Sequence, residues 1–135
     1  MGHILAALLA IAAPATVDEL HIATLTFSKE NSLEWGQLID QGRIRNVTII
    51  CSQYFEKTST GIYEFACNIL LPRGVKIIPI RSHCKIIAAR LSTGHTITAE
   101  GSANTRSART LEQVTLFGSP AVYDFHVKQM RRAIS

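Results

Sequence analysis

Long apolar segments are missing from this chain of 135 residues. No stretch reaches the ~18–20 consecutive apolar residues that a membrane-spanning helix needs, so we expect no stable membrane insertion. Charged residues are also few, at 18%, whereas 47% of the residues are hydrophobic. This composition is typical of a chain that buries a sizeable core and is not disordered. Because repeats, linkers and low-complexity segments are absent too, we expect residues 1–135 to form a single domain.

Cysteine is scarce, and its spacing does not suit a zinc site. The three cysteines, Cys51, Cys67 and Cys84, are odd in number and form no Cys-x-x-Cys pair. Each lies in apolar surroundings, where a cysteine usually packs as a small hydrophobic residue. A reducing compartment, the cytoplasm, is therefore the simpler interpretation.

The amino-terminal MGHILAALLAIAAPA allows two interpretations. Its apolar run has the length of a signal peptide and ends in an Ala-Pro-Ala that imitates a cleavage site, which would imply export to the periplasm with residues 1–15 removed. However, no Lys or Arg precedes the run. We favour the alternative, a helix that ends at Pro14 and packs on the core. One face of this helix carries Ile4, Leu5, Leu8 and either Ile11 or Ala12.

The first part of the chain alternates strand and helix patterns. Buried strands are predicted at 19–27, 47–52 and 75–80, where β-branched and apolar residues are continuous. A helix begins after the N-cap Ser28 and ends at Gly42, and a second is predicted over 58–71. Pro79 cannot donate a hydrogen bond to a neighbouring strand, so the third strand is expected to be an edge strand or to end near this residue. This order implies right-handed crossovers and parallel strand pairs.

The second part of the chain predicts an antiparallel extension. Strands at 83–90 and 95–100 are joined at Ser92-Thr93-Gly94, a last strand lies at 113–117, and a helix over 119–134 begins at Ser119 or Pro120. We therefore predict the α/β class, with a mixed, mostly parallel central sheet and helices on both faces.

Charge is distributed unevenly along the chain. Up to Pro72 there are four Lys and Arg against seven Asp and Glu, and from Arg73 onward there are ten against three. The first part is therefore −3 and the second +7. A basic surface suits a phosphate-bearing partner, because Lys and Arg release counterions from a polyanion. A solvated basic surface without a partner is an equally good interpretation.

Polar residues gather around one predicted hairpin. In a strand, residues two apart face the same side, so His83 and Lys85 are expected to project together. The returning strand places Gly101, Ser102 and Asn104 near the start of the His83 strand. Glycine permits a tight turn, and serine and asparagine supply hydrogen-bond donors. A nucleophile, a cation and several donors at one point suit an anionic phosphate diester.

These residues resemble the signature of the phospholipase D superfamily, which is His-x-Lys, then Gly-Ser-x-Asn after a short hairpin, then a glutamate. The matching segments here are His83-Cys84-Lys85, Gly101-Ser102-Ala103-Asn104 and Glu112. SANTRSARTLEQ and YDFHVKQM are similar to segments of small bacterial and phage members, and the resemblance extends from IATLTFS onward. The full signature has an aspartate five positions after the lysine, where this chain has Arg90. The fold implied is a phospholipase D-like half-domain.

The resemblance implies a phosphodiesterase that needs no metal and no cofactor. His83 would attack phosphorus to form a phosphohistidine, and a second histidine would protonate the leaving oxygen and then activate water. Lys85, Asn104 and Ser102 would hold the non-bridging oxygens, and Glu112 would orient a histidine.

One active site in this family needs two such motifs, and the chain has one. The resemblance therefore implies a homodimer in which His83 of each subunit meets across a two-fold axis. His95, beside the predicted hairpin turn, and His126, on the last helix, are expected to be surface or packing residues.

Cations near the motifs favour a nucleic acid as substrate. Arg81, Arg90, Arg106 and Arg109 flank them, and a polyanion rewards cations beyond the scissile phosphate. We predict that DNA or RNA is bound by Arg81, Gly101, Arg106 and Arg109, with little sequence preference, and is cleaved by a nuclease activity. The alternatives are a nucleic-acid-binding relative with weak or no catalysis, a phospholipid phosphodiesterase, and a structural module in which His83 and Lys85 pair with Glu112.

Overall fold

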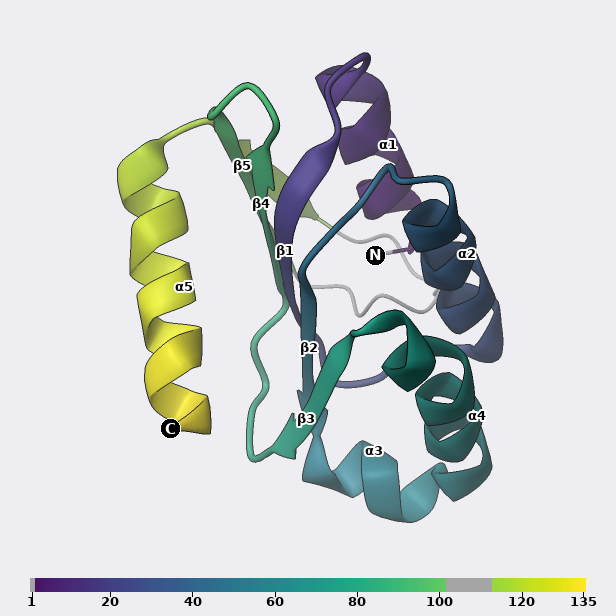
Figure 1. Ribbon diagram of the computed structural model, residues 1–135. Helices are drawn as coiled ribbons and strands as arrows, with labels where there is room; N and C mark the ends of the chain where they lie inside the picture. Colours follow the sequence, from purple (N-terminus) through teal and green to yellow (C-terminus); the bar gives the residue numbers. More distant parts are fainter. Residues whose placement is uncertain (1, 102–112) are drawn as a thin grey trace.

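The computed structural model describes residues 2–101 and 113–135, which form one central sheet between two layers of helices (Figure 1). Helix α5 covers one face of the sheet, and α1, α2 and α4 lie on the other. In chain order the elements are α1 (Gly2–Ala12), β1 (Val17–Ala23), α2 (Lys29–Asp40), β2 (Val47–Ser52), α3 (Gln53–Thr58), α4 (Thr60–Leu70), a 3-10 turn (Leu71–Arg73), β3 (Lys76–Ile80), β4 (Ile86–Leu91), β5 (Thr96–Gly101), β6 (Val114–Phe117) and α5 (Pro120–Ile134).

The sheet joins a parallel half to an antiparallel half in the order β3-β2-β1-β4-β5-β6. β1 pairs with β2 and β2 with β3 in parallel, whereas β1–β4, β4–β5 and β5–β6 are antiparallel. The α/β class, the mixed sheet and the helices on both faces are therefore as predicted. The parallel part is smaller than expected, because among the described strands only two of the five pairings are parallel. Pro79 lies in β3, which is an edge strand as predicted.

Local signals determine where α2 begins and ends. The Ser28 hydroxyl accepts a hydrogen bond of 3.1 Å from the Asn31 amide, and the Asn31 side chain accepts one of 2.9 Å from the Ser28 amide. This reciprocal capping satisfies amides that the first turn of a helix leaves without partners. Gly42 follows the helix with φ of 72°, a left-handed conformation that glycine adopts readily. Both boundaries match the sequence prediction.

The helix predicted over 58–71 corresponds to α4 at 60–70, and a short helix that the sequence did not predict, α3 at 53–58, precedes it. Ser52 caps α3 by accepting a hydrogen bond of 3.1 Å from the Tyr54 amide, and the backbone at Ser59 is not helical, which separates α3 from α4. Phe55 explains the extra helix, because its ring is fully buried and packs against Phe27 with centroids 4.8 Å apart and the ring planes tilted by 56°. Phe55 and Phe27 are distant in sequence, so the local pattern of hydrophobic residues does not reveal their contact.

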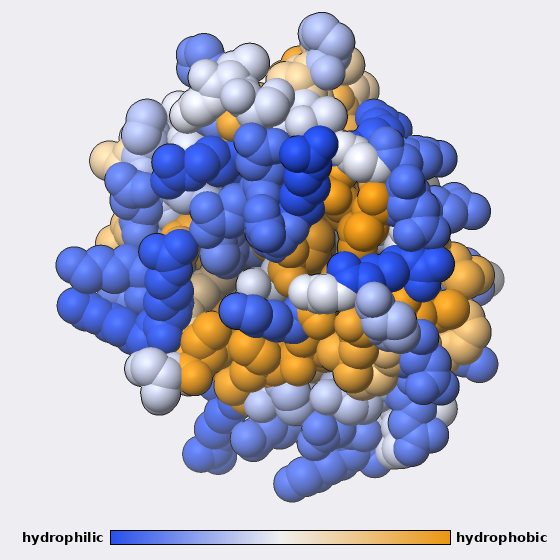
Figure 2. All heavy atoms as spheres, viewed as in Figure 1, coloured by the Kyte–Doolittle hydropathy of each residue, from blue (hydrophilic) through white to orange (hydrophobic). Residues whose placement is uncertain are grey.

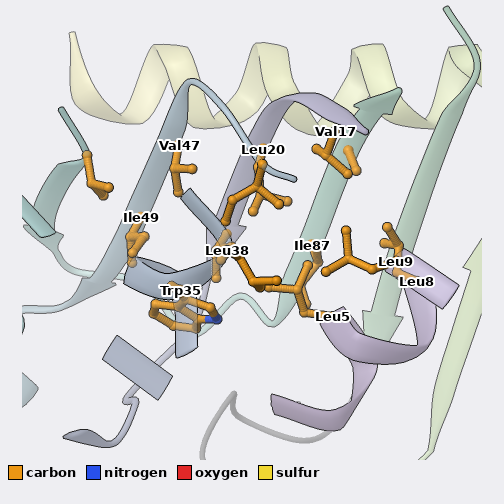
Figure 3. Packing of buried hydrophobic residues seen from close by; sticks show 14 of the residues in the cluster. Leu5, Leu8, Leu9, Val17, Leu20, Trp35, Leu38, Val47, Ile49 and Ile87 are labelled. Carbon is orange, nitrogen blue, oxygen red and sulfur yellow. The ribbon is translucent and has the colours of Figure 1, made fainter. Parts of the chain in front are cut away.

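The larger part of the core lies between the sheet and helices α1, α2 and α4. Figure 3 shows Leu5, Leu8 and Leu9 of α1 against Ile87. Trp35 and Leu38 of α2 pack against the same face of the sheet. The amino-terminal segment is thus a helix that packs on the core, as we favoured, although Ile11 is 62% exposed and Ala12 is buried instead.

The face under α5 holds a smaller and more polar interface. Its apolar contacts come from Met130 with the neighbouring strands and from Tyr123 and Val127 with Ala88. Charged groups also meet here: Glu19 accepts a hydrogen bond from Arg131 at 3.0 Å and pairs with His21 at 2.7 Å. α5 begins at Pro120 behind the capping Ser119, as the sequence predicted.

The surface on the side of α5 is also more polar than the middle of the molecule. Figure 2 shows mostly hydrophilic side chains on the side of α5, whereas hydrophobic side chains reach the surface in the middle of the view, where the edge strand β3 lies. Within the part of the chain that the structure describes, no helix combines the length and apolar character needed to cross a membrane.

Candidate active site

The segment that carries His83 crosses one edge of the sheet. β3 and β4 are three strand positions apart, and residues 81–85 connect them. Three strand spacings of ~4.8 Å are about 14 Å, and the six Cα–Cα steps from Ile80 to Ile86 reach at most ~20–22 Å. The segment therefore uses most of its length to pass the ends of β2 and β1. This explains why β4 begins at Ile86 and the predicted strand 83–90 was wrong at its start.

His83 is consequently placed by a crossing segment and not by a strand face. Its side chain is exposed, and the residues on either side of it are linked by a hydrogen bond of 3.1 Å that the Ser82 hydroxyl accepts from the Cys84 amide. The crossing occurs at the carboxyl ends of the parallel strands. In open α/β sheets this edge is where ligands bind.

A pocket of about 560 Å³ opens at this edge. Its volume lies within the ~300–1,000 Å³ typical of small-molecule sites. Its walls come from the ends of β1 and β2, from α3 and from the crossing segment. The residues that line it are Leu25, Ser52, Gln53, Tyr54, Lys57, Arg81, Ser82 and His83. Lys57 and Arg81 supply positive charge, and the lining includes no carboxylate.

The second half of the predicted constellation begins beside Lys85. The Gly101 amide donates a hydrogen bond of 3.2 Å to the Lys85 carbonyl, and Glu100 pairs with Ile86 in the β4–β5 register. The hairpin therefore returns to the start of β4, as the sequence predicted. Lys85 is half-buried.

The other residues predicted for the site, which are Ser102, Asn104, Arg106, Arg109 and Glu112, lie outside the described residues.

Gly101 is explained by close packing of strands. A Cβ atom at this position would lie 2.8 Å from the Gln113 carbonyl oxygen and 3.0 Å from a methyl of Val114. No side chain fits against backbone at that distance, so glycine is needed for β6 to pair here. The contact also places Gln113, which directly follows Glu112 in sequence, next to Gly101.

Arg81 and Arg90, both near the motif in sequence, have different environments. Arg81 lines the His83 pocket. Arg90 lies near the far end of β4, where its guanidinium is 5.1 Å from the ring centre of Tyr123 and within 4.0 Å of carboxylate oxygens of Glu19 and Asp124. Arg90 therefore contributes to the contact between the sheet and α5 and is not among the residues that line the His83 pocket.

Two histidines outside the motif occupy the predicted elements. His95 is exposed beside the β4–β5 turn, with its Nδ1 3.0 Å from the Thr93 hydroxyl. His126 lies on α5, but sequence reasoning missed its partner: His126 Nε2 is hydrogen-bonded to the Glu100 carboxylate, one residue before Gly101. Nothing in the sequence spacing indicates this pair, because its members come from separate elements.

Sequence reasoning also missed the α3 side of the pocket. Gln53, Tyr54 and Lys57 were not candidates, because no helix or strand was predicted over 53–57. Their position directly after β2 was the available signal, since segments that follow parallel strands form the ligand-binding edge of an α/β sheet.

Charge and burial set the pKa of several groups. Burial by itself raises the pKa of Glu19, but the hydrogen bond and charge of His21, with the charges of Arg131 and Arg90, hold it below the ordinary value. Burial, together with Glu56 and Cys67, raises the pKa of the Cys51 thiol to about 12. Cys51 therefore stays neutral and packs as predicted, whereas Cys84 is exposed, contrary to expectation. Within 2–101 and 113–135, no three His, Cys, Asp or Glu residues are grouped as a metal site would require.

Comparisons with known proteins extend to the fold alone. No protein-family model matches the chain, and no curated protein matches it. Among solved structures, a crystal structure of polyphosphate kinase from Porphyromonas gingivalis superposes on 98% of this chain, with a TM-score of 0.63 and 12% sequence identity. This chain spans only 24% of that chain. The likeness shows that the α/β arrangement described above also occurs within a solved polyphosphate kinase structure.

Proposed function

We propose that this protein is a metal-independent phosphodiesterase that cleaves DNA or RNA through a phosphohistidine on His83. The observation that supports it most is the position of His83: an exposed imidazole lines a pocket with Lys57 and Arg81 at the carboxyl edge of the parallel strands. The hydrogen bond between Gly101 and Lys85 further supports the proposal, because the Gly-Ser-x-Asn segment begins beside the His-x-Lys segment. Imidazole, cations and donors together are the groups that a phosphodiester needs.

The proposed reaction has two displacements. A nitrogen of His83 bonds to phosphorus while the bond from phosphorus to the leaving oxygen breaks, and a second histidine gives its proton to that oxygen. The second histidine then takes a proton from water, whose oxygen bonds to phosphorus as the phosphorus–nitrogen bond breaks. Both histidines return to their starting states. Lys85, Ser102 and Asn104 would stabilise the negative charge on the non-bridging oxygens, and Glu112 would orient a histidine.

The second histidine is proposed to be His83 of a second subunit. His95 lies at a turn between β4 and β5, and His126 is engaged with Glu100 on the α5 face. Neither lines the pocket of His83. A symmetric homodimer supplies the missing imidazole without another residue from this chain.

The structural neighbour supports phosphoryl chemistry in general terms. A polyphosphate kinase is by its name an enzyme that transfers phosphoryl groups. This favours an enzyme on this fold, and the choice of a nucleic acid rests on the cations of the pocket and on the basic second part of the chain.

A second candidate is a nucleic-acid-binding protein of this fold with weak or no catalysis. The observation that favours it is Arg90, which replaces the aspartate of the family signature and contacts Tyr123, Glu19 and Asp124. That position now joins the sheet to α5, whereas the cations beside His83 are still present to hold a phosphate backbone.

The decisive experiment is incubation of the purified protein with single-stranded DNA, duplex DNA and RNA in excess EDTA at two salt concentrations. Cleavage in chelator by the unmodified protein and by His95→Ala, but not by His83→Ala, supports the proposal. His95 is the matched control because it is an exposed histidine at a turn remote from the pocket.

Other outcomes contradict the proposal in distinguishable ways. Salt-sensitive binding without cleavage favours the non-catalytic candidate. Cleavage that EDTA abolishes would refute the metal-independent mechanism. If nucleic acid is neither bound nor cleaved, phosphatidylcholine vesicles are the next substrate, because a phospholipid offers the same diester.

A further inference from the structure

We propose that Tyr54 is a stacking platform for a nucleobase next to the scissile phosphate, so that the substrate is single-stranded nucleic acid. The inference rests on the proposed function and assigns a substrate class to the same pocket. It comes from three properties of Tyr54: its exposure, the rigidity of its backbone and the groups that share its pocket.

The ring of Tyr54 is exposed on a rigid support. Its side chain is 70% exposed, although it lies within a helix next to the fully buried Phe55. The Tyr54 amide donates to the Ser52 hydroxyl at 3.1 Å, and its carbonyl accepts from the Thr58 hydroxyl at 2.8 Å. Contacts of Phe55 with Phe27 hold α3 to the core. A ring presented in this way loses little conformational freedom when a base stacks on it.

The pocket places this ring with the groups that would hold a backbone. Tyr54, Lys57, Arg81 and His83 line the same pocket of about 560 Å³. Lys57 comes from the same helix as Tyr54, and Arg81 and His83 come from the crossing segment opposite it. A base on Tyr54 would therefore belong to a nucleotide whose phosphates meet Lys57, Arg81 or His83.

Stacking on Tyr54 discriminates between single strands and duplexes. Every base has an aromatic face that can stack, so a platform of this kind binds single strands with little sequence preference. In a duplex those faces are covered by neighbouring bases, and exposing one requires unstacking and unpairing. Lys57 and Arg81 can contact the backbone of either form, whereas Tyr54 can contact only an exposed base.

The experiment measures binding of the full-length chain, and of Tyr54→Ala, Tyr54→Phe and Tyr54→Trp, to a fluorescent single-stranded 12-mer DNA and to its duplex in EDTA. We expect Tyr54→Ala to weaken single-strand binding by about 5- to 150-fold, the range given by loss of one base–aromatic stack, and duplex binding by less than about 2-fold. Tyr54→Phe and Tyr54→Trp keep an aromatic face and should restore single-strand binding.

The matched control is Phe125→Ala, since Phe125 is an aromatic residue on α5 that is 59% exposed. It should change neither affinity. Equal losses on single strand and duplex, no loss in Tyr54→Ala, or failure of Tyr54→Phe to restore binding would each overturn the inference while leaving a nuclease possible. A monomer in place of a dimer for Tyr54→Ala on size-exclusion chromatography would also overturn it, by assigning Tyr54 to a subunit contact. If the unmodified protein binds neither DNA nor a single-stranded RNA of the same length, both the inference and the proposed function fail.

Discussion

The Gly101 amide donates a hydrogen bond of 3.2 Å to the carbonyl oxygen of Lys85. This bond closes the β4–β5 hairpin at the point where the crossing segment enters the sheet. It joins the two parts of the motif through backbone atoms, so their proximity does not depend on the conformation of a flexible side chain. The proposed chemistry depends on this arrangement.

Covalent catalysis predicts a trapped intermediate on His83. When a labelled oligonucleotide is mixed with the enzyme and quenched without acid, the peptide that contains His83 should carry the phosphoryl group, because the histidine nitrogen bonds to phosphorus before water does. Tandem mass spectrometry identifies the modified residue. His83→Ala should show no adduct and a turnover lower by roughly 10³-fold or more. An adduct on another residue would contradict the mechanism.

A shared site predicts a non-linear response to subunit mixing. If each active site needs His83 from both subunits, activity follows the square of the fraction of unmodified subunits. An equal mixture of unmodified protein and His83→Ala, after subunit exchange, should therefore retain about one quarter of the activity, because only dimers with two intact subunits are active. Independent sites would leave about one half. Mass photometry or analytical ultracentrifugation checks that the mixture is dimeric.

Removing a cation from the pocket should reduce the salt dependence of nucleic-acid binding. Each phosphate contact to a single strand contributes about −0.7 to the slope of log affinity against log salt. Lys57→Ala and Arg81→Ala should each lower the magnitude of the slope by roughly that amount, measured by fluorescence anisotropy. Lys76→Ala is the control, because Lys76 is also exposed but lies at the opposite end of β3 from Arg81. An effect of Lys76→Ala equal to that of the other two would place the backbone elsewhere.

Helix α1 is predicted to be part of the folding unit. Leu8 is 1% exposed within the main core, so Leu8→Ala should lower the free energy of unfolding by about 2–5 kcal/mol, through lost burial and the cavity left behind. Ile11→Ala, on the exposed side of the same helix, should change it by less than about 0.5 kcal/mol. Urea unfolding followed by the fluorescence of the buried Trp35 measures both. Equal effects would mean that α1 does not pack as described.

The unmodified protein should be more stable than Glu19→Gln at neutral pH, and this difference should disappear in acid. Its pKa in the folded protein is lower than the ordinary 4.5, so its contribution is present above pH 4.5 and is lost as the pH falls through the folded pKa. Glu19→Gln should therefore reduce the free energy of unfolding at pH 7 by about 1 kcal/mol, the scale of a partly exposed ion pair. The reduction should shrink steadily as the pH falls below 4.5.

Denaturant unfolding at several pH values tests this, with Glu64→Gln as the exposed carboxylate control. A reduction that stays constant down to acid pH would show that the ion pairs of Glu19 do not carry its contribution.

Several elements were predictable because their causes are local. Strand β2 has the predicted bounds, 47–52, since a continuous β-branched run between polar segments suits a buried strand. Ser28, Gly42 and Ser119 mark helix boundaries through their own side chains or backbone angles. The position of Gly101 beside the start of β4 was also predictable, because a short hairpin determines its own register.

The remaining features required the tertiary structure. β4 begins at Ile86 and not at the predicted residue 83, because the order of the strands requires the preceding residues to cross the sheet edge. No local sequence pattern encodes that order. The contact of Phe55 with Phe27 stabilises α3. The Glu100–His126 pair joins a strand to a helix that comes later in the chain.

The sequence by itself therefore determined the α/β class, most of the elements and the residue types of the candidate site, since these follow from periodicity, capping and spacing. Only the tertiary structure decided that His83 shares a pocket with Tyr54, Lys57 and Arg81, and that Arg90 belongs to the contact with α5. The physical reason is that such neighbours are chosen by the packing of distant segments, which depends on strand order and on buried contacts across the whole chain.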